Sequence, residues 1–297
     1  MYVIECPHLS LDKIYASGQV PRWRRMADGK YLVTDGTQAV KVVQSRNKLL
    51  FNCSEDEFYG KWFDYFDMKT DHEMLNYRIS RCGDTMKVWA NRSQGVRIVR
   101  QDLFEILVSS ILSEGRTRYH AGIVINCLCK VCGNKHVQGM AESGKVRWYE
   151  FPSPEQILDN MQRICNTLLG VDTDSMLAQY LRFVCRLYCD GHFDVTLLSA
   201  MEYSDAKEYL VDEGLSEWAA DYVCLYGLHM MEAYPDDDAV GEALAKSFGD
   251  SDLVEVCDWY CPKLQSQMGL IYQYVLYNLL NPPVEFVYTG FGRRAIS

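Results

Sequence analysis

The pattern of apolar and polar positions divides the 297-residue chain into a short sheet and a longer helical part. Apolar and polar residues alternate over residues 31–53, and two turn signals, Asp-Gly and Ser-Arg-Asn, interrupt them. This alternation predicts an antiparallel meander. From about Asp64 onward the apolar residues take helical spacing. The sequence therefore predicts an α+β fold, with an N-terminal antiparallel sheet domain over residues 1–90 and a helical domain over residues 91–297.

Five helices of the helical domain have clear signals. One is expected to begin at Pro154 with Ser153 as its cap, because proline is favoured at the first helical position. The other four are amphipathic or wholly apolar stretches, over residues 103–113, 176–188, 218–231 and 269–280. The first of these four is apolar on nearly every side, which indicates burial on most sides.

Charge is divided unevenly between the two halves of a chain whose net charge is −10. Residues 1–150 hold 22 Lys/Arg and 17 Asp/Glu, whereas residues 151–297 hold 8 and 23. Nucleic-acid binding favours a basic surface, because ion pairing and counterion release drive it. The acidic second half is unfavourable for gripping phosphates and predicts instead a possible basic protein partner.

The twelve cysteines follow no disulfide framework and lie partly in apolar helical patterns, so we expect reduced thiols. Cys129 and Cys132 have the spacing of half a zinc site, but Cys257 and Cys261 form a poor second half. We therefore expect no metal and no cofactor. No apolar segment approaches the roughly 18 residues of a membrane span, and the first residues lack a signal-peptide pattern. The prediction is a cytoplasmic monomer.

Three segments carry a family resemblance: "SGQVPRW" at 17–23, "GVRIVRQDLFEILVSSILS" at 95–113 and "ADYVCLYGLHMMEAYPDDD" at 220–238. Together they resemble the 8-oxoguanine DNA glycosylase family, whose members are helix-hairpin-helix glycosylases. Order and spacing agree over roughly residues 5–280. The resemblance implies an antiparallel sheet followed by a two-lobed helical body with the active site between the lobes, and a hairpin near residues 211–221.

The resemblance also implies the chemistry. Such enzymes extrude the target base from the duplex, and a carboxylate then stabilises positive charge at C1′ of the sugar. Bifunctional members add a lysine nucleophile that cleaves the strand. Asp237 falls on the carboxylate position, with a solvated acidic helix start as the alternative. Trp218 falls on the lysine position, so β-lyase activity is predicted to be absent.

Three further positions correspond to the base pocket of the family. Gly18 matches the glycine whose carbonyl accepts the N7–H of an oxidised guanine, although the segment also fits a simple turn before a strand. Tyr272 and Leu276 fall on the pocket-lining glutamine and phenylalanine, whereas a shift by one residue would select Gln273 and Tyr277. At helical spacing these residues also fit a core position.

The DNA-binding positions depart furthest from the family. In the hairpin the first glycine is kept as Gly214 and the second is replaced by Ser216, with several carboxylates around them. These carboxylates would repel a DNA phosphate. Arg116 and Arg118 follow the signature helix and could contact DNA, or they are two solvated charges at a helix end.

The resemblance therefore predicts a DNA glycosylase-type protein of base-excision repair, similar to 8-oxoguanine DNA glycosylase, with double-stranded DNA as its partner. It is at most a monofunctional N-glycosylase that uses Asp237. Two alternatives remain open. One is an N-glycosidase that acts on a free modified purine nucleoside, for which no phosphate-gripping hairpin is needed. The other is a catalytically silent interaction protein.

Overall fold

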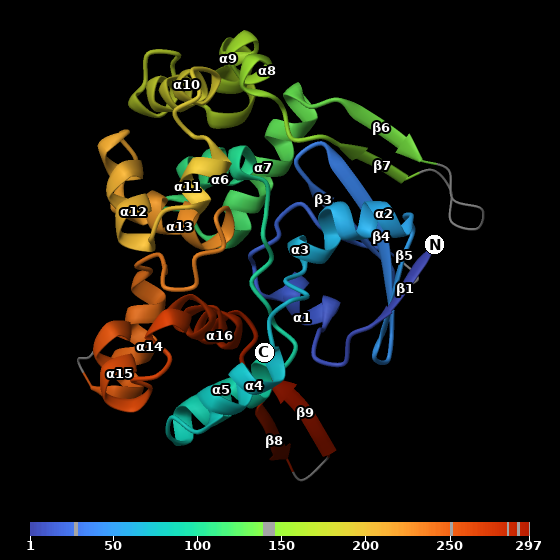
Figure 1. The fold of residues 1–297 in the computed structure, drawn as a ribbon, viewed down its shortest axis with the longest axis vertical. Coiled ribbons are helices and arrows are strands. Elements are labelled where there is room, and N and C mark those ends of the chain that lie inside the picture. Colours follow the sequence, from blue (N-terminus) through green and yellow to red (C-terminus); the bar gives the residue numbers. More distant parts are fainter. Residues whose placement is uncertain (27–28, 139–145, 250–251, 284, 290–291, 297) are drawn as a thin grey trace.

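The computed structural model describes residues 1–26, 29–138, 146–249, 252–283, 285–289 and 292–296. A five-stranded antiparallel sheet lies on one side of the protein, and helices form the rest of the body (Figure 1). The α+β fold expected from the sequence, an N-terminal antiparallel sheet followed by helices, is confirmed.

The sheet has the strand order β1-β5-β4-β3-β2. The predicted meander forms its centre, and Asp35 pairs with Gln38 across the first turn. The strand β1 returns from the N-terminus to pair with β5, with Tyr2 opposite Phe51. The strands are β1 (Tyr2–Glu5), β2 (Arg24–Arg25), β3 (Tyr31–Asp35), β4 (Gln38–Ser45) and β5 (Lys48–Phe51).

An aromatic-rich core forms between this sheet and four short helical elements. Phe51, Phe58 and Phe66 are fully buried there, and the Trp23 indole donates a hydrogen bond of 2.8 Å to the Tyr65 hydroxyl. The helical elements are α1 (Leu11–Ala16), α2 (Glu55–Glu57), the π-helical turn η1 (Phe58–Trp62) and α3 (Phe63–Tyr65).

The helical body has two cores, and α6 separates them. Ile106, Leu107 and Ile111 of α6 pack into one core, while Phe104 and Leu112 pack into the other. All residues of α6 are buried as a result, which explains why its sequence is apolar on nearly every side. Besides α6 (Leu103–Ser113), the elements of the first core include α4 (His72–Ser80), α5 (Asp84–Ser93), α11 (Val195–Ser199), α12 (Tyr203–Asp212), α13 (Glu217–Tyr226), α14 (Asp238–Phe248), α15 (Leu253–Tyr260) and α16 (Met268–Leu280). The 3₁₀ turn η3 (Gln265–Gln267) comes directly before α16.

The second core forms the upper lobe in Figure 1. Its helix α8 begins as predicted, with Pro154 in the first turn and a capping box between Ser153 and Gln156. The elements that build this lobe are α6 (Leu103–Ser113), α7 (Arg118–Cys132), α8 (Pro154–Asp159), α9 (Met161–Ile164), the π-helical turn η2 (Cys165–Leu169) and α10 (Met176–Cys189).

The prediction of a helix over residues 218–231 was wrong at its C-terminal end. The helix α13 ends at Tyr226, and His229 has a φ of +62°, which a continuing right-handed helix excludes. The chain therefore turns, and residues 227–237 connect α13 to α14.

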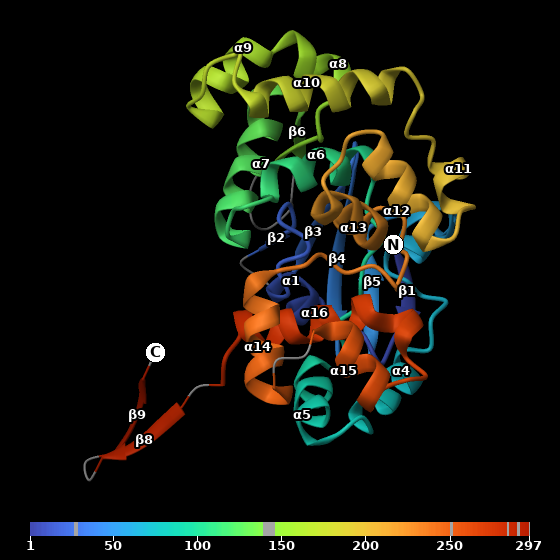
Figure 2. The ribbon, with the colours of Figure 1, turned by 90° about the vertical axis from the view of Figure 1, so that its left-hand side faces the viewer.

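Two β-hairpins were not predicted. They pair β6 (Lys135–Gln138) with β7 (Val146–Tyr149) and β8 (Glu285–Thr289) with β9 (Gly292–Ile296). Figure 2 shows the second of these standing away from the body. Among the described residues, no helix has both the length and the apolar character that crossing a membrane requires.

Candidate active site

The predicted hairpin region is a turn between α12 and α13, over residues 213–216. Gly214 has a φ of +94°, and a Cβ there would lie 3.0 Å from Cε1 of Phe183, so glycine is needed. Ser216 has a φ of −65°, which any residue adopts, and its Oγ accepts a hydrogen bond of 3.1 Å from the Ala219 N–H. The turn therefore needs only one of the two glycines of the family.

Asp237 is the N-cap residue of α14, and its side chain is about one quarter exposed. Its carboxylate accepts hydrogen bonds from three donors. Arg118 Nη2 lies 3.0 Å from Oδ2, Trp218 Nε1 lies 3.3 Å from Oδ1, and the Tyr272 hydroxyl also donates to Oδ2. Three predicted site positions from different parts of the chain thus converge on Asp237, which fixes the orientation of its carboxylate.

Arg118 is the first residue of α7, and its guanidinium is held among aromatic side chains. It lies 5.6 Å from the centre of the Tyr222 ring, and its Nη2 donates to the Tyr272 hydroxyl at 2.6 Å. Burial disfavours the charge, but Tyr272, Tyr226, Tyr222 and Asp237 outweigh it, so the pKa of Arg118 lies well above its usual value. The guanidinium is therefore permanently charged. Arg116, by contrast, is exposed and donates only to the Leu112 carbonyl, at 3.2 Å.

Trp218 and Asp237 line a cavity of about 590 Å³ between the hairpin and α14. Lys207 of α12 also lines it, although sequence reasoning passed this lysine over. Its Nζ lies 3.0 Å from Oδ2 of Asp221 and 3.4 Å from Oε2 of Glu217. Burial lowers the pKa of Lys207, but these two carboxylates raise it more, so the side chain is held as an ammonium. The sequence did contain a signal for this contact. Lys207 and Asp221 are the same number of residues from Gly214, so they lie at matching positions on the two arms of the hairpin.

Gly18 lines a different cavity, of about 580 Å³, together with Arg118, Tyr119 and Leu280. Its φ is +78°, and a Cβ there would lie 3.0 Å from Cδ1 of Leu280 and 3.7 Å from Cγ of Arg118. The aliphatic part of Arg118 therefore lies beside Gly18 while its guanidinium reaches Asp237. The arginine side chain connects the Gly18 cavity to the Asp237 cavity.

The other two pocket positions differ from each other. Neither residue lines either cavity: Tyr272 is fully buried and reaches Asp237 through its hydroxyl, whereas Leu276 packs in the core. Gln273 is also fully buried; it donates 2.9 Å to the Ser17 carbonyl and accepts 2.7 Å from the Tyr226 hydroxyl. The site therefore uses α16 through Tyr272, while Gln273 ties α16 to the segment that carries Gly18.

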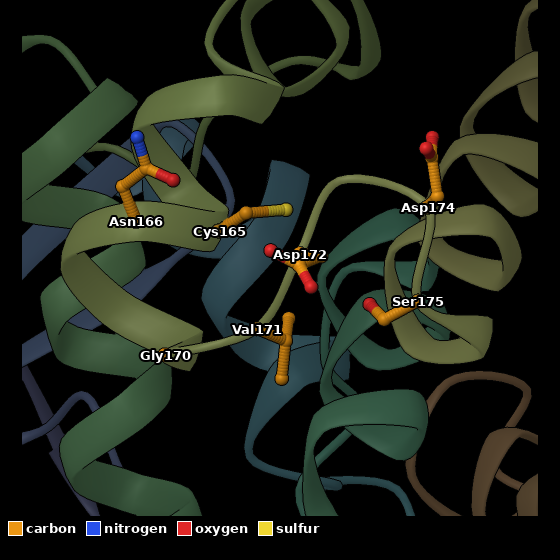
Figure 3. Close-up of a pocket in the computed structure, with 7 residues that line it drawn as sticks. All are labelled: Cys165, Asn166, Gly170, Val171, Asp172, Asp174 and Ser175. Atoms are coloured by element: carbon orange, nitrogen blue, oxygen red, sulfur yellow. The ribbon is translucent and has the colours of Figure 1, made fainter.

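A larger hollow, of about 740 Å³, lies in the upper lobe between η2 and α10 (Figure 3). Its lining includes Cys165, Asp172 and Asp174, and Asn166 and Asp174 stand on its opposite sides. No lysine, arginine or aromatic side chain is among its lining residues. It lacks the combination of charges found at Asp237 and is not a candidate for the same chemistry.

Two carboxylates of the hairpin each have a basic side chain beside them. Glu213 lies 3.0 Å from Nδ1 of His192, and Glu217 is paired with Lys207. Within the described part of the chain, no group of three or more Cys, His, Asp or Glu side chains is arranged to hold a metal ion. Cys129 and Cys132 close α7, and the Gly133 N–H after them donates 2.8 Å to the Cys129 carbonyl.

An N-terminal antiparallel sheet, a helical body and a hairpin followed by a fixed aspartate define the class of helix-hairpin-helix DNA glycosylases. Comparison with known proteins agrees. Residues 2–107 match the family model described as the 8-oxoguanine DNA glycosylase N-terminal domain. This part of the chain is therefore similar to the 8-oxoguanine DNA glycosylase family.

Individual relatives are distant but cover most of the chain. A DNA-3-methyladenine glycosylase of Bacillus subtilis (strain 168) is 25% identical over 80% of this chain and 74% of its own length. A probable N-glycosylase/DNA lyase of Methanothermobacter thermautotrophicus is 25% identical over 82% of this chain and 86% of its own. The solved structure of MBOgg1 in complex with a low affinity DNA ligand has a TM-score of 0.81 and 25% identity, and the match covers 93% of each chain.

Proposed function

We propose that the protein is a DNA N-glycosylase of base-excision repair that releases a damaged purine by hydrolysis, with Asp237 as the catalytic carboxylate. The observation that carries this proposal is the convergence of Arg118, Trp218 and Tyr272 on a partly exposed Asp237 beside the hairpin. A carboxylate held in one orientation stabilises developing positive charge without reorganising at the moment of reaction.

The reaction begins with extrusion of the target nucleotide, because C1′ of the sugar cannot be reached within the stacked duplex. The C1′–N9 bond then breaks, and its electron pair leaves with the base. The Asp237 carboxylate stabilises the positive charge on the sugar. A water molecule attacks C1′ and transfers a proton to Asp237, and the departing base takes up a proton from solvent.

Strand cleavage through an imine is not part of the proposal. Trp218 has no amine, and its indole N–H donates to Asp237. Lys207 does line the cavity, but Asp221 and Glu217 hold it as an ammonium, which is not a nucleophile. The product is therefore an abasic site in an intact strand.

Double-stranded DNA is the proposed partner, because the related MBOgg1 was solved with a DNA ligand and its match covers 93% of this chain. The acidic hairpin weakens phosphate contacts, although Lys207 offsets part of its charge. We further propose that the protein acts as a monomer in the cytoplasm. A basic protein partner for the acidic second half stays a prediction.

The test is to incubate the protein at low salt with a duplex that carries 8-oxoguanine opposite cytosine, and to score abasic sites and nicks separately. We expect breaks after alkali and none before it. Asp237→Asn, prepared identically, controls for contaminating glycosylase. Duplex binding without base release would instead favour the catalytically silent alternative, and nicking before alkali would contradict the hydrolytic mechanism.

A further inference from the structure

Opposite charges are arranged in a line across the site. The Arg118 side chain forms part of the wall of the Gly18 cavity, and its guanidinium ends at Asp237, in the wall of the neighbouring cavity. The aliphatic part of Arg118 lies beside Gly18, and its guanidinium lies between the Gly18 cavity and Asp237, which lines the neighbouring cavity.

One donor of Arg118 is unused. The guanidinium Nη2 donates to Asp237 and Tyr272, whereas Nη1 is buried and finds no hydrogen-bond partner among the described residues. A buried donor without a partner costs free energy, which a ligand that accepts its hydrogen bond restores. The Gly18 cavity beside this arginine is open and has room for a base.

Cleavage of a glycosidic bond creates a matching pair of charges. The electrons of the C1′–N9 bond leave with the base, so a neutral purine departs as an anion while the sugar becomes a cation. A purine nucleotide methylated at N7 or N3 already carries a positive charge on its base, so that base departs neutral. Only the first kind of base therefore gains from a fixed positive charge beside it.

We propose that Arg118 is a catalytic residue that contacts the extruded base, stabilises the negative charge on the departing purine, and so selects neutral oxidised purines over cationic alkylated ones. This inference rests on the proposed glycosylase function. Arg118 keeps Nη2 on Asp237 and uses Nη1 to donate to a carbonyl oxygen of the base, where much of the departing charge resides. It remains protonated throughout, and the base receives its final proton from solvent.

Other cations near the two cavities are poorer candidates. Lys207 is occupied by Asp221 and Glu217, and Lys130 of the Gly18 cavity is exposed. Trp218 contributes no charge at all. Arg118 is the cation that contacts both Asp237 and the aromatic cluster that closes the site.

The test measures single-turnover base release from two duplexes, one with 8-oxoguanine and one with 7-methylguanine, both opposite cytosine. The variants are Arg118→Gln and, as a matched control, Arg78→Gln at an exposed position of α4 that lines neither cavity. We expect the wild-type protein to prefer 8-oxoguanine. Arg118→Gln should slow 8-oxoguanine release by on the order of 10²-fold and 7-methylguanine release much less, because the second substrate loses only the positioning of Asp237.

The ratio of the two rates separates catalysis from structure. An equal loss on both duplexes would show that Arg118 only positions Asp237, and would overturn the inference while leaving the proposed function intact. A wild-type preference for 7-methylguanine would overturn it as well. Release of neither base by the wild-type protein would remove the proposed function, and this inference with it.

Discussion

Two arginine–carboxylate pairs of this protein resemble each other in chemistry and differ in surroundings. Arg22 pairs with Glu105 where the sheet meets α6, and both side chains are 3% exposed. Arg118 pairs with Asp237 beside the hairpin, and these side chains are 16% and 26% exposed. The first pair lies within two segments that carry the family resemblance, and the second joins residues outside those two segments.

The Arg22 pair is satisfied on every side. Arg22 Nη2 donates 2.8 Å to the Tyr149 carbonyl, and the Gly36 N–H donates 2.8 Å to Oε2 of Glu105. Burial raises the pKa of Glu105 to about 7 against the opposing effect of Arg22. Among the described residues, neither side chain has a buried polar atom without a partner, and the pair joins the sheet to the helical body.

The Arg118 pair is incomplete. Nη1 of Arg118 has no partner among the described residues, and Asp237 opens onto a cavity. The comparison teaches that two of the three segments with the family resemblance, those that carry Arg22 and Glu105, serve the fold, whereas Asp237 lies in the third. Whether the chain is an enzyme depends on residues outside those two segments.

The largest expected effect comes from breaking the Arg22 pair. Arg22→Ala leaves a buried Glu105 carboxylate without its cation, and such losses cost about 3–5 kcal/mol of unfolding free energy. Denaturant unfolding measures it. The control is Lys246→Ala, because Lys246 and Glu242 form an exposed pair at 3.6 Å whose loss should change stability by less than about 0.5 kcal/mol. Similar losses in both variants would mean that burial does not distinguish the pairs.

The next effect in size is on activity. Asp237→Asn keeps the shape of the side chain and removes its charge, so base release should fall by roughly 10²- to 10³-fold. Single-turnover release of 8-oxoguanine measures the change, and the unfolding midpoint serves as the control for folding. Full activity in this variant would show that Asp237 has no catalytic role. Both arginine–carboxylate pairs would then be structural.

The sequence predicted the secondary-structure elements better than it predicted which strands pair with one another. Local patterns predicted the meander and α6, whose bounds are those expected, Leu103–Ser113. They missed the pairing of β1 with β5, because strand partners distant in sequence leave no periodic signal. The end of α13 was also missed, since the turn depends on a positive φ at His229.

The site was predicted by position along the chain rather than by contact. Order alone placed Asp237 and Trp218 at the positions of the carboxylate and the lysine, and those roles stay predictions. It did not reveal that Arg118 reaches Asp237, because 119 residues separate them and α7 gives no pattern for the contact. Lys207 was missed for a similar reason, since its partners lie on the opposite arm of the hairpin.

A smaller effect is expected at Trp218, which tests how firmly Asp237 must be held. Its ring stacks on Tyr222 with centres 5.1 Å apart, and its Nε1 donates to Asp237. Trp218→Phe keeps an aromatic ring and removes the donor, which is worth about 1 kcal/mol, so base release should slow roughly fivefold. Measurement at saturating protein separates this loss from weaker DNA binding. A loss as large as that of Asp237→Asn would assign Trp218 a role beyond one hydrogen bond.

The smallest effect belongs to Ser216, which lies in the active half of the molecule but serves the fold. Its Oγ caps α13 by accepting from the Ala219 N–H. Ser216→Ala should therefore lower the unfolding free energy by about 1 kcal/mol, and Ser216→Gly by only a few tenths, because glycine is itself tolerated as a cap. Denaturant unfolding of the two variants, side by side, measures the difference. If Ser216→Ala bound duplex DNA more weakly while its unfolding midpoint stayed unchanged, Ser216 would contact DNA rather than stabilise the fold. The hairpin would then contain both structural residues and DNA-binding residues.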